Sequence, residues 1–336
     1  MPLDVSDIDI LILSLSAVAL GMFFLVKGGD WTVDSSVYVA HKLKISPMVV
    51  GFTILAFGTS FPELLASATA NLKGAPGIAI GNVLGSNVAN VLMVCGATAI
   101  LTPLIAQPKI LMRDTIVMLL CTVVLTVLML TDHLDRWIGL SLFLLLLVYT
   151  YVKYRLAVKA AEDDKNAGKD SSAEQEDTAF ESMKKALLFL LAGLVIISFG
   201  ADLLVRGSVV TARLLGVPEL VIGLSMIAIG TSLPELSTCF AAAKKGHTDV
   251  VLGNIIGSNI FNILMIIGIC IFLKPIAMSD IDSRAVTLDV WVTLGVMVLF
   301  SLWIMLFRKI GKISGSVFVL FYIVYIVLQY QSAAFG

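Results

Sequence analysis

Long apolar runs constrain this sequence more than any other feature. Runs of about twenty apolar residues recur along the chain, and that is the length a helix needs to cross a hydrocarbon core of roughly 30 Å. Of the 336 residues, 58% are hydrophobic and only 14% are charged. The pattern predicts an all-α polytopic membrane protein with ten transmembrane helices. The predicted spans are 9–38, 47–70, 77–101, 114–131, 137–155, 185–212, 218–242, 249–273, 286–307 and 313–330.

The sequence repeats itself at a spacing of 172 residues without a gap. Between 51–96 and 223–268, 20 of 46 positions are identical, and they include Gly, Pro, Glu and Asn. Shared apolar composition cannot produce identities of that kind. Each copy holds five spans, and an odd number makes the second copy enter the membrane from the opposite side. The sequence therefore predicts two inverted-topology five-helix repeats, 1–156 and 184–336, joined by a polar cytoplasmic linker at 157–183.

The distribution of Lys and Arg predicts the orientation in the membrane. With the N-terminus outside, 16 of the 23 basic residues fall in inner loops, Lys153 and Lys245 among them, and 5 fall in outer loops. Cytoplasmic loops carry such an excess of basic residues. We therefore expect a multi-pass protein of the cell (inner) membrane, embedded in the lipid bilayer, with both termini outside. The net charge of −1 gives no bias toward nucleic acid as a partner.

Two spans contain the same helix-breaking motif, GTSFPEL in the second span and GTSLPEL in the seventh. Pro62 and Pro234 lack the N–H that would continue the helix, so a backbone carbonyl one turn earlier loses its usual partner. Such breaks persist in membranes only where they are buried in protein or line a cavity. Glu63 and Glu235 follow directly. An intramembrane carboxylate indicates function by default, so both acids are candidate ligands.

The second duplicated motif, GNxxGSNxxN, spaces polar residues four apart, which places them on one face of a helix. Together the two motifs offer carboxylate, hydroxyl, amide and backbone oxygens, a donor set that suits hard cations such as Ca²⁺ and Na⁺. A simpler explanation stands beside this one, because membrane Ser and Thr often bond to their own helix, Asn joins helices and Gly serves packing. The two stripes are Asn82, Ser86 and Asn90, and Asn254, Ser258 and Asn262.

The remaining sulfur-bearing and charged residues of the spans indicate no other site. The four cysteines lie in apolar runs without CxxC spacing, which favours packing over disulfide or zinc chemistry. We expect no cofactor. Four charged residues fall near span ends and are expected to lie outside the central site: Asp30, Asp34, Asp202 and Arg206.

At these motifs the sequence resembles the cation/calcium exchanger superfamily, specifically its prokaryotic sodium/calcium antiporters. The resemblance covers all ten predicted spans, and the paired motifs correspond to the alpha repeats of that family. It implies that Glu63 and Glu235 are the central ion ligands. Some relatives carry Asp where this chain has Asn262, so potassium dependence and ion stoichiometry stay open. The resemblance further implies oxygen ligands from Thr59, Ser60, Ser86, Asn90, Thr231, Ser232, Ser258 and Asn262, and backbone carbonyls of Ala56 and Ala228.

The function implied by the resemblance is antiport that exports Ca²⁺ by inward movement of Na⁺. The spans 9–38 and 185–212 would slide against the other helices to expose the site alternately. Ca²⁺/H⁺ exchange is the alternative, because a midplane Glu can carry a proton. An intramembrane hydrolase is disfavoured, since no His–Glu zinc motif and no nucleophile–base pair occurs, so we expect no enzyme. A passive cation channel would differ in lacking coupling to a countergradient.

Overall fold

A computed structural model describes residues 5–105, 108–166, 180–217, 228–281 and 283–335 of the protein. Within these ranges eight helices are long and apolar enough to cross a membrane, and a bent helix pair makes up to nine. The prediction of an all-helical multi-pass membrane protein is therefore confirmed. The predicted seventh span, 218–242, begins in residues outside the described part, so the count of ten helices stays a prediction.

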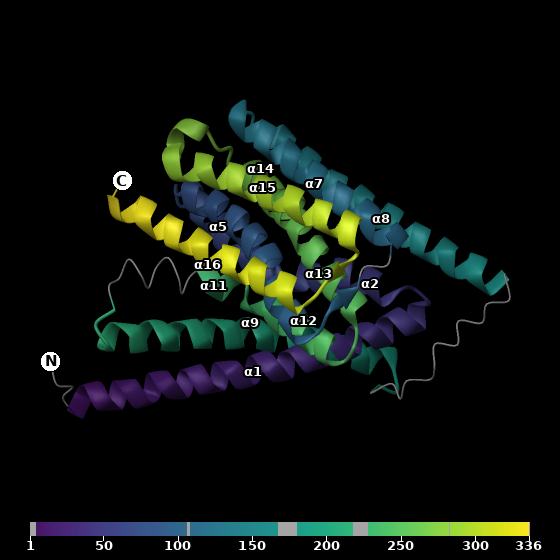
Figure 1. Ribbon diagram of the computed structural model, residues 1–336, viewed down its shortest axis with the longest axis horizontal. Coiled ribbons are helices and arrows are strands. Elements are labelled where there is room, and N and C mark those ends of the chain that lie inside the picture. Colours follow the sequence, from purple (N-terminus) through teal and green to yellow (C-terminus); the bar gives the residue numbers. More distant parts are fainter. Residues whose placement is uncertain (1–4, 106–107, 167–179, 218–227, 282, 336) are drawn as a thin grey trace.

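The described residues form helices, with one two-stranded contact between the two halves of the chain (Figure 1). η1, η2 and η4 are π-helical turns, and η5 is a short 3₁₀ helix. The first half contains α1 (Val5–Leu43), α2 (Pro47–Val50), η1 (Gly51–Leu55), α3 (Ala56–Thr59), α4 (Phe61–Leu72), α5 (Pro76–Ala89), η2 (Asn90–Cys95), α6 (Gly96–Leu101), β1 (Leu104–Ile105), α7 (Pro108–Leu130) and α8 (Arg136–Asn166). The second half contains α9 (Met183–Leu214), α11 (Ala228–Thr231), α12 (Leu233–Lys244), α13 (Thr248–Phe261), η4 (Asn262–Ile267), α14 (Gly268–Leu273), η5 (Met278–Asp280), α15 (Ser283–Phe307), β2 (Lys309–Ile310) and α16 (Lys312–Phe335).

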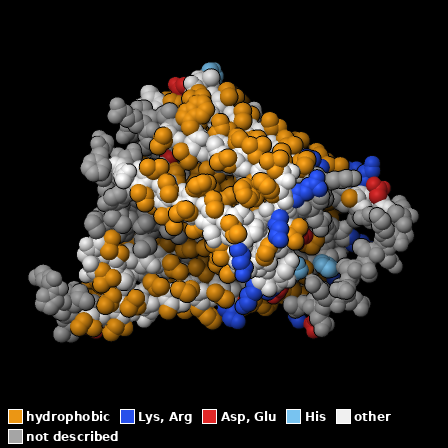
Figure 2. Space-filling view, viewed as in Figure 1, with side chains coloured by type: hydrophobic (Ala, Val, Ile, Leu, Met, Phe, Trp, Pro, Cys, Tyr) orange, Lys and Arg blue, Asp and Glu red, His pale blue; other side chains and the backbone are white. Residues whose placement is uncertain are grey.

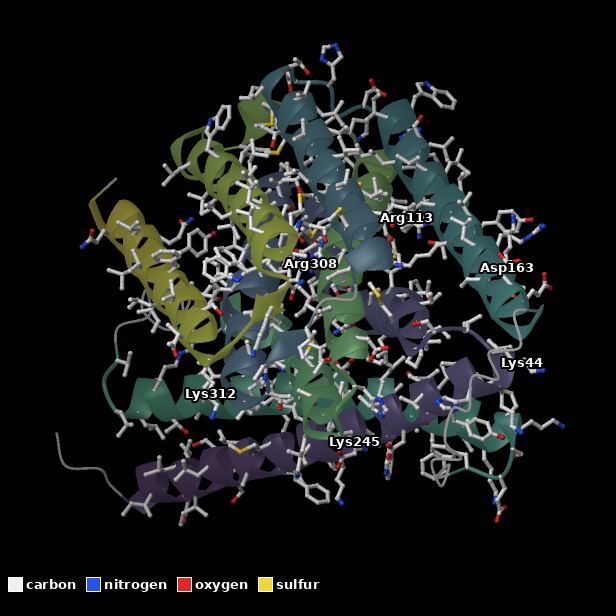
Figure 3. The ribbon with its side chains drawn as sticks, turned by 45° about the vertical axis from the view of Figure 1, so that its right-hand side comes forward. Lys44, Arg113, Asp163, Lys245, Arg308 and Lys312 are labelled. Atoms are coloured by element: carbon white, nitrogen blue, oxygen red, sulfur yellow. The ribbon has the colours of Figure 1, made fainter. Side chains whose placement is uncertain are left out.

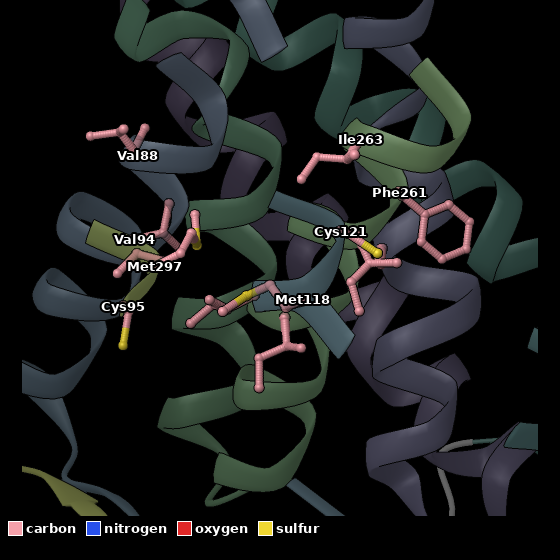
Figure 4. Packing of buried hydrophobic residues seen from close by; sticks show 14 of the residues in the cluster. Val88, Val94, Cys95, Met118, Cys121, Phe261, Ile263 and Met297 are labelled. Atoms are coloured by element: carbon pink, nitrogen blue, oxygen red, sulfur yellow. The ribbon is translucent and has the colours of Figure 1, made fainter. Parts of the chain in front are cut away.

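Two continuous spans form the centre of the bundle. They are Pro76–Leu101, made of α5, η2 and α6, and Thr248–Leu273, made of α13, η4 and α14. They are 83% and 89% buried over their apolar windows, against 17–44% for the other long spans. A helix that is apolar all round must be surrounded by other helices. Figure 4 shows the resulting core, where side chains of α5, α7, α13 and α15 pack together.

α1 and α9 lie side by side as an antiparallel pair along one flank of the bundle (Figure 1). Small residues recur every seven positions along their contact and let the backbones approach closely. A Cβ at Gly21 would lie 2.7 Å from the carbonyl oxygen of Gly200, and a Cβ at Gly207 would lie 2.6 Å from that of Ser14. Because their backbones pack this closely, we expect α1 and α9 to move together.

Basic residues gather at element ends on one side of the molecule. Figure 2 shows Lys and Arg along one border of a largely apolar face. Figure 3 labels basic side chains within the first or last turns of helices or directly after them, and all of them belong to the set predicted for inner loops. The labelled basic residues are Lys44, Arg113, Lys245, Arg308 and Lys312.

The structure corrects the prediction that Lys153 lies in an inner loop. α8 continues to Asn166, eleven residues beyond the predicted span 137–155, so the beginning of the predicted linker is helical. Lys153 lies within this helix, is only 1% exposed, and forms an ion pair with the buried Asp114 of α7. A hydropathy pattern places such a lysine in a loop because it cannot detect a carboxylate on another helix.

Candidate functional site

Both GTSxPE motifs interrupt a helix at the serine. α3 ends and α4 begins around Ser60, whose φ and ψ are −84° and 2°, and the two halves of this span meet at a bend of 41°. Ser232 has nearly the same geometry between α11 and α12, with φ and ψ of −91° and 4°. Proline lies in the first turn after each break, where its missing N–H is tolerated. The structure therefore breaks the helices where both motifs predicted it.

The two acids of these motifs lie deep in the bundle and near each other. Glu63 and Glu235 are each 1% exposed, and their carboxyl groups are close enough to repel one another. The Ser60 hydroxyl donates a hydrogen bond to Glu235 Oε1 at 3.4 Å, which links the two halves of the chain. The Thr59 hydroxyl instead donates to the Leu55 carbonyl of its own span at 3.0 Å, and Ser258 is buried. Three predicted ligands from both halves, Ser60, Glu63 and Glu235, thus meet at one place.

The asparagines that end the second motif each begin a π-helical turn. η2 starts at Asn90 and η4 at Asn262, the corresponding positions of the two repeats. π-helical turns are rare and occur frequently at functional sites, because the wider turn reorients side chains and carbonyls. Asn90 and Asn262 are both buried, and Asn262 Nδ2 donates to Asn87 Oδ1 at 3.0 Å.

Many buried oxygen atoms of the motifs have no hydrogen-bond partner within the described residues. Buried polar atoms are normally paired, so a concentration of unpaired oxygens needs an explanation. All of these atoms can bind a cation, and none is sulfur or imidazole nitrogen. They are Glu63 Oε2, Ser86 Oγ, Asn90 Oδ1, Ser232 Oγ, Glu235 Oε2, Asn254 Oδ1, Ser258 Oγ, Asn259 Oδ1 and Asn262 Oδ1.

The backbone and peripheral members of the predicted set are less well defined. The Ala56 carbonyl accepts the Ser60 N–H at 3.1 Å, so one of its two lone pairs is already used. Thr231 is half-buried at the end of α11. Ala228 begins α11, and its side chain lies outside the described part of the structure. No group of three or more His, Cys, Asp or Glu side chains that could hold a metal occurs among the described residues.

Two residues of the polar stripes, Asn82 and Asn254, contact the helices that carry the two acids. Asn82 Nδ2 donates to Ser67 Oγ at 2.9 Å, which ties α5 to α4. Asn254 Nδ2 lies 3.5 Å from Cys239 Sγ, the position that corresponds to Ser67 in the second repeat. The sequence analysis missed Asn87 as the partner of Asn262, although its identity in both copies of the motif was a usable signal.

The charged residues expected outside the site lie on α1 and α9. Arg206 pairs with Asp202 on the same helix at 2.8 Å. Lys245, at the end of α12, pairs with Asp34 at 2.6 Å and Asp30 at 3.4 Å on α1. These ion pairs are partly exposed, and their residues make no recorded contact with Glu63 or Glu235 within the described ranges.

Comparison with known proteins identifies the family. The model of the family described as sodium/calcium exchanger protein matches residues 13–155 and 185–331. The chain is 31% identical to the sodium/calcium exchanger MaX1 of Methanosarcina acetivorans, over 93% of this chain and 97% of that protein. It is 35% identical to the putative antiporter CaxA of Alkalimonas amylolytica, over 94% and 98% of the two chains.

A solved structure of the sodium-calcium exchanger NCX_Mj superposes with a TM-score of 0.80 at 32% identity, covering 94% of this chain and 98% of the other. Family, sequence and fold therefore agree over nearly the whole length. The chain belongs to the sodium/calcium exchanger family and is a multi-pass membrane antiporter for cations that include Ca²⁺, not an enzyme.

Proposed function

We propose that the protein exchanges Ca²⁺ for Na⁺ across the cell membrane by alternating access. The observation that carries the proposal is the pair of buried carboxylates, Glu63 and Glu235, contributed by the two breaks and surrounded by unpaired oxygens. Two carboxylates balance the charge of one Ca²⁺ without a protein cation. Na⁺ as the coupling ion is supported by the relatives named sodium/calcium exchangers.

The proposed ion site consists of Glu63 and Glu235 with the neutral oxygens around them. Na⁺ would use overlapping and flanking members of the same set, so Ca²⁺ and Na⁺ compete and cannot be carried together. The neutral ligands are Thr59, Ser60, Ser86, Asn90, Thr231, Ser232, Ser258 and Asn262, with the carbonyls of Ala56 and Ala228.

We further propose ten membrane helices in two inverted repeats, 1–156 and 184–336, with a cytoplasmic linker at 157–183 and both termini outside. The gathering of basic residues at element ends supports this orientation. The close-packed pair of α1 and α9 is the element that would slide. A Cβ at Gly58 would lie 2.4 Å from Leu194, and one at Gly230 2.4 Å from Val205, so α9 covers both breaks and its movement would uncover them.

Ca²⁺/H⁺ exchange is the second candidate, favoured by the burial of two carboxyl groups that repel each other. Either acid could carry a proton in place of a metal ion. Proteoliposomes containing the purified protein separate the two functions. An imposed outward Na⁺ gradient should drive ⁴⁵Ca²⁺ uptake at equal pH on both sides. Uptake driven by a pH gradient alone, and unaffected by Na⁺, would contradict the proposal.

A further inference from the structure

α7 and α8 carry a buried charge cluster away from the ion site. Asp114 of α7 is fully buried and forms an ion pair with Lys153 of α8. Tyr149, one turn before Lys153, donates a hydrogen bond to Asp114 Oδ1 at 2.8 Å. The Lys153 ammonium also lies 3.2 Å from the ring centroid of Phe52 in η1. The negative charge of Asp114 is thus neutralised inside the protein.

α15 and α16 carry the counterpart of this cluster in the second half. Asp289 of α15 is 8% exposed and accepts a hydrogen bond at 3.2 Å from the Tyr325 hydroxyl of α16. Gln329, one turn after Tyr325, contacts the same carboxylate oxygen. Counted from the first residue of each helix, the two aspartates and the two tyrosines occupy the same positions, and a neutral glutamine occupies the place of Lys153. This register is three to four residues longer than the 172-residue spacing of the motifs. The first cluster also contains Arg113, 3.5 Å from Asp114, whereas Leu288 precedes Asp289.

Among the described residues, no cation pairs with the carboxylate of the counterpart cluster. None of the ion pairs among the described residues includes Asp289. The titratable groups that face the cluster are the hydroxyls of Tyr325 and, beyond it, Tyr322. Arg284 is the nearest basic residue on α15, but its side chain lies outside the described part.

We propose that Asp289, Tyr325 and Gln329 form a proton-binding site in which a proton supplies the charge that Lys153 supplies in the first half. Burial of an ionised carboxylate without a counter-ion is expensive, and uptake of a proton removes that charge. Both recorded contacts reach Oδ1, which leaves Oδ2 to carry the proton. The glutamine amide can present its oxygen to a carboxylic acid or its N–H to a carboxylate, so it suits both states.

The location of Asp289 connects this site to the aqueous phase and to the ion site. Asp289 lies six residues after the start of α15 and Gln329 six residues before the end of α16, so the cluster lies near the same end of this helix pair, which the sequence prediction places at one membrane border. In the proposed orientation this border is the outer one. One turn further along α15, the Thr293 hydroxyl donates to the Leu84 carbonyl of α5 at 3.5 Å. α5 carries Ser86, so a change at Asp289 can reach the ion site through α15.

Infrared difference spectra of the purified protein test the proton directly, without any transport. Parent minus Asp289→Asn at neutral pH should contain a carboxylic-acid C=O band, because the signals of Glu63 and Glu235 cancel. Gln329→Lys should lose the band, since an installed ammonium stabilises the carboxylate, whereas the uncharged Gln329→Met should keep it.

A parent spectrum without the band, or a Gln329→Lys spectrum that retains it, would overturn the proposal. A band that appears only when Na⁺ and K⁺ are replaced by choline would also overturn it, because a metal cation would then be the bound species. The consequence for flux rests on the proposed function. Dependence of Ca²⁺ flux on external pH should weaken in Gln329→Lys and persist in Gln329→Met. An intact band without Na⁺-driven flux would refute the exchange function alone.

Discussion

The first and second halves of the chain differ in the side chains that surround a buried aspartate away from the motifs. At the motifs, Ser60 and Ser232 have the same backbone geometry, and each second motif ends in a π-helical turn. In the last two long helices of each half, by contrast, Lys153 is replaced by neutral Gln329 beside otherwise matching Asp and Tyr residues. The halves agree at the motifs, where the proposed ion would contact both of them, and they diverge in these peripheral helix pairs.

A second difference concerns the contacts of α1 and α9 with the rest of the bundle. Lys245 ends α12 and pairs with two aspartates of α1. Lys73 occupies the corresponding position after α4, and no ion pair of Lys73 is recorded within the described ranges. Among the described residues, the charge contact between α1 and the helix after the break is therefore present in the second repeat and not in the first.

The largest effect should come from removing either of the duplicated acids. Glu63→Gln and Glu235→Gln should each abolish Na⁺-driven ⁴⁵Ca²⁺ uptake, because each removes half of the charge that faces a desolvated divalent ion. The amide keeps the side-chain shape, so both variants should elute as folded protein in size-exclusion chromatography. If one of the two variants is inactive and the other transports normally, the two acids are not equivalent.

The next largest effect should be a loss of stability, caused by a substitution in the first half that has no equivalent in the second. Lys153→Gln removes the buried cation of Asp114 and leaves only the partly exposed Arg113, 3.5 Å away, which should lower the free energy of unfolding by up to about 3–5 kcal/mol at neutral pH. The difference from the parent should shrink as the pH falls, since protonated Asp114 no longer needs the cation. Gln329→Met is the matched control and should change stability by less than about 1 kcal/mol. Equal melting temperatures for Lys153→Gln and the parent would rule out this role.

A smaller effect should follow from adding a third acid at the π-helical turns. Asn262→Asp brings a negative charge toward Glu63 and Glu235, so one carboxyl should take up a proton, and flux should vary more steeply between about pH 6 and 8. Asn90→Asp should act similarly. Asn262→Asp also loses the hydrogen bond to Asn87, at a cost of about 1 kcal/mol in stability. Flux-versus-pH curves that superimpose on the parent's would place residue 262 outside the ion site.

The smallest effect should come from removing the partly exposed ion pairs between Lys245, which follows α12, and Asp30 and Asp34 of α1. Lys245→Gln should alter the exchange rate by less than about fivefold, because such pairs contribute up to about 1 kcal/mol. Lys73→Gln is the control and should leave the rate unchanged. Stopped-flow Ca²⁺ release with Na⁺ added on one side resolves effects of this size. Equal changes in both variants would mean that the asymmetry of this contact has no bearing on exchange.

The sequence predicts the site better than its surroundings. Pro62 and Glu63 disrupt a helix and introduce a charge where they occur, so a local pattern reveals them, and duplication confirms that the pattern is meaningful. The partner of Lys153 lies on another helix and 39 positions away, and no local pattern contains that information. The extension of α8 to Asn166 was not predicted for a related reason. The end of a long apolar run predicts a loop, although polar residues also form helices outside the membrane.

The central claim is that both halves build one ion site, and equilibrium ⁴⁵Ca²⁺ binding to the purified protein tests it most directly. The parent should bind one Ca²⁺ per chain in the absence of Na⁺, and added Na⁺ should displace it. Glu63→Gln and Glu235→Gln should each lose that one ion, since neither half can hold it alone. Two Ca²⁺ per chain in the parent, with one retained in each single variant, would mean two independent sites and would contradict the account.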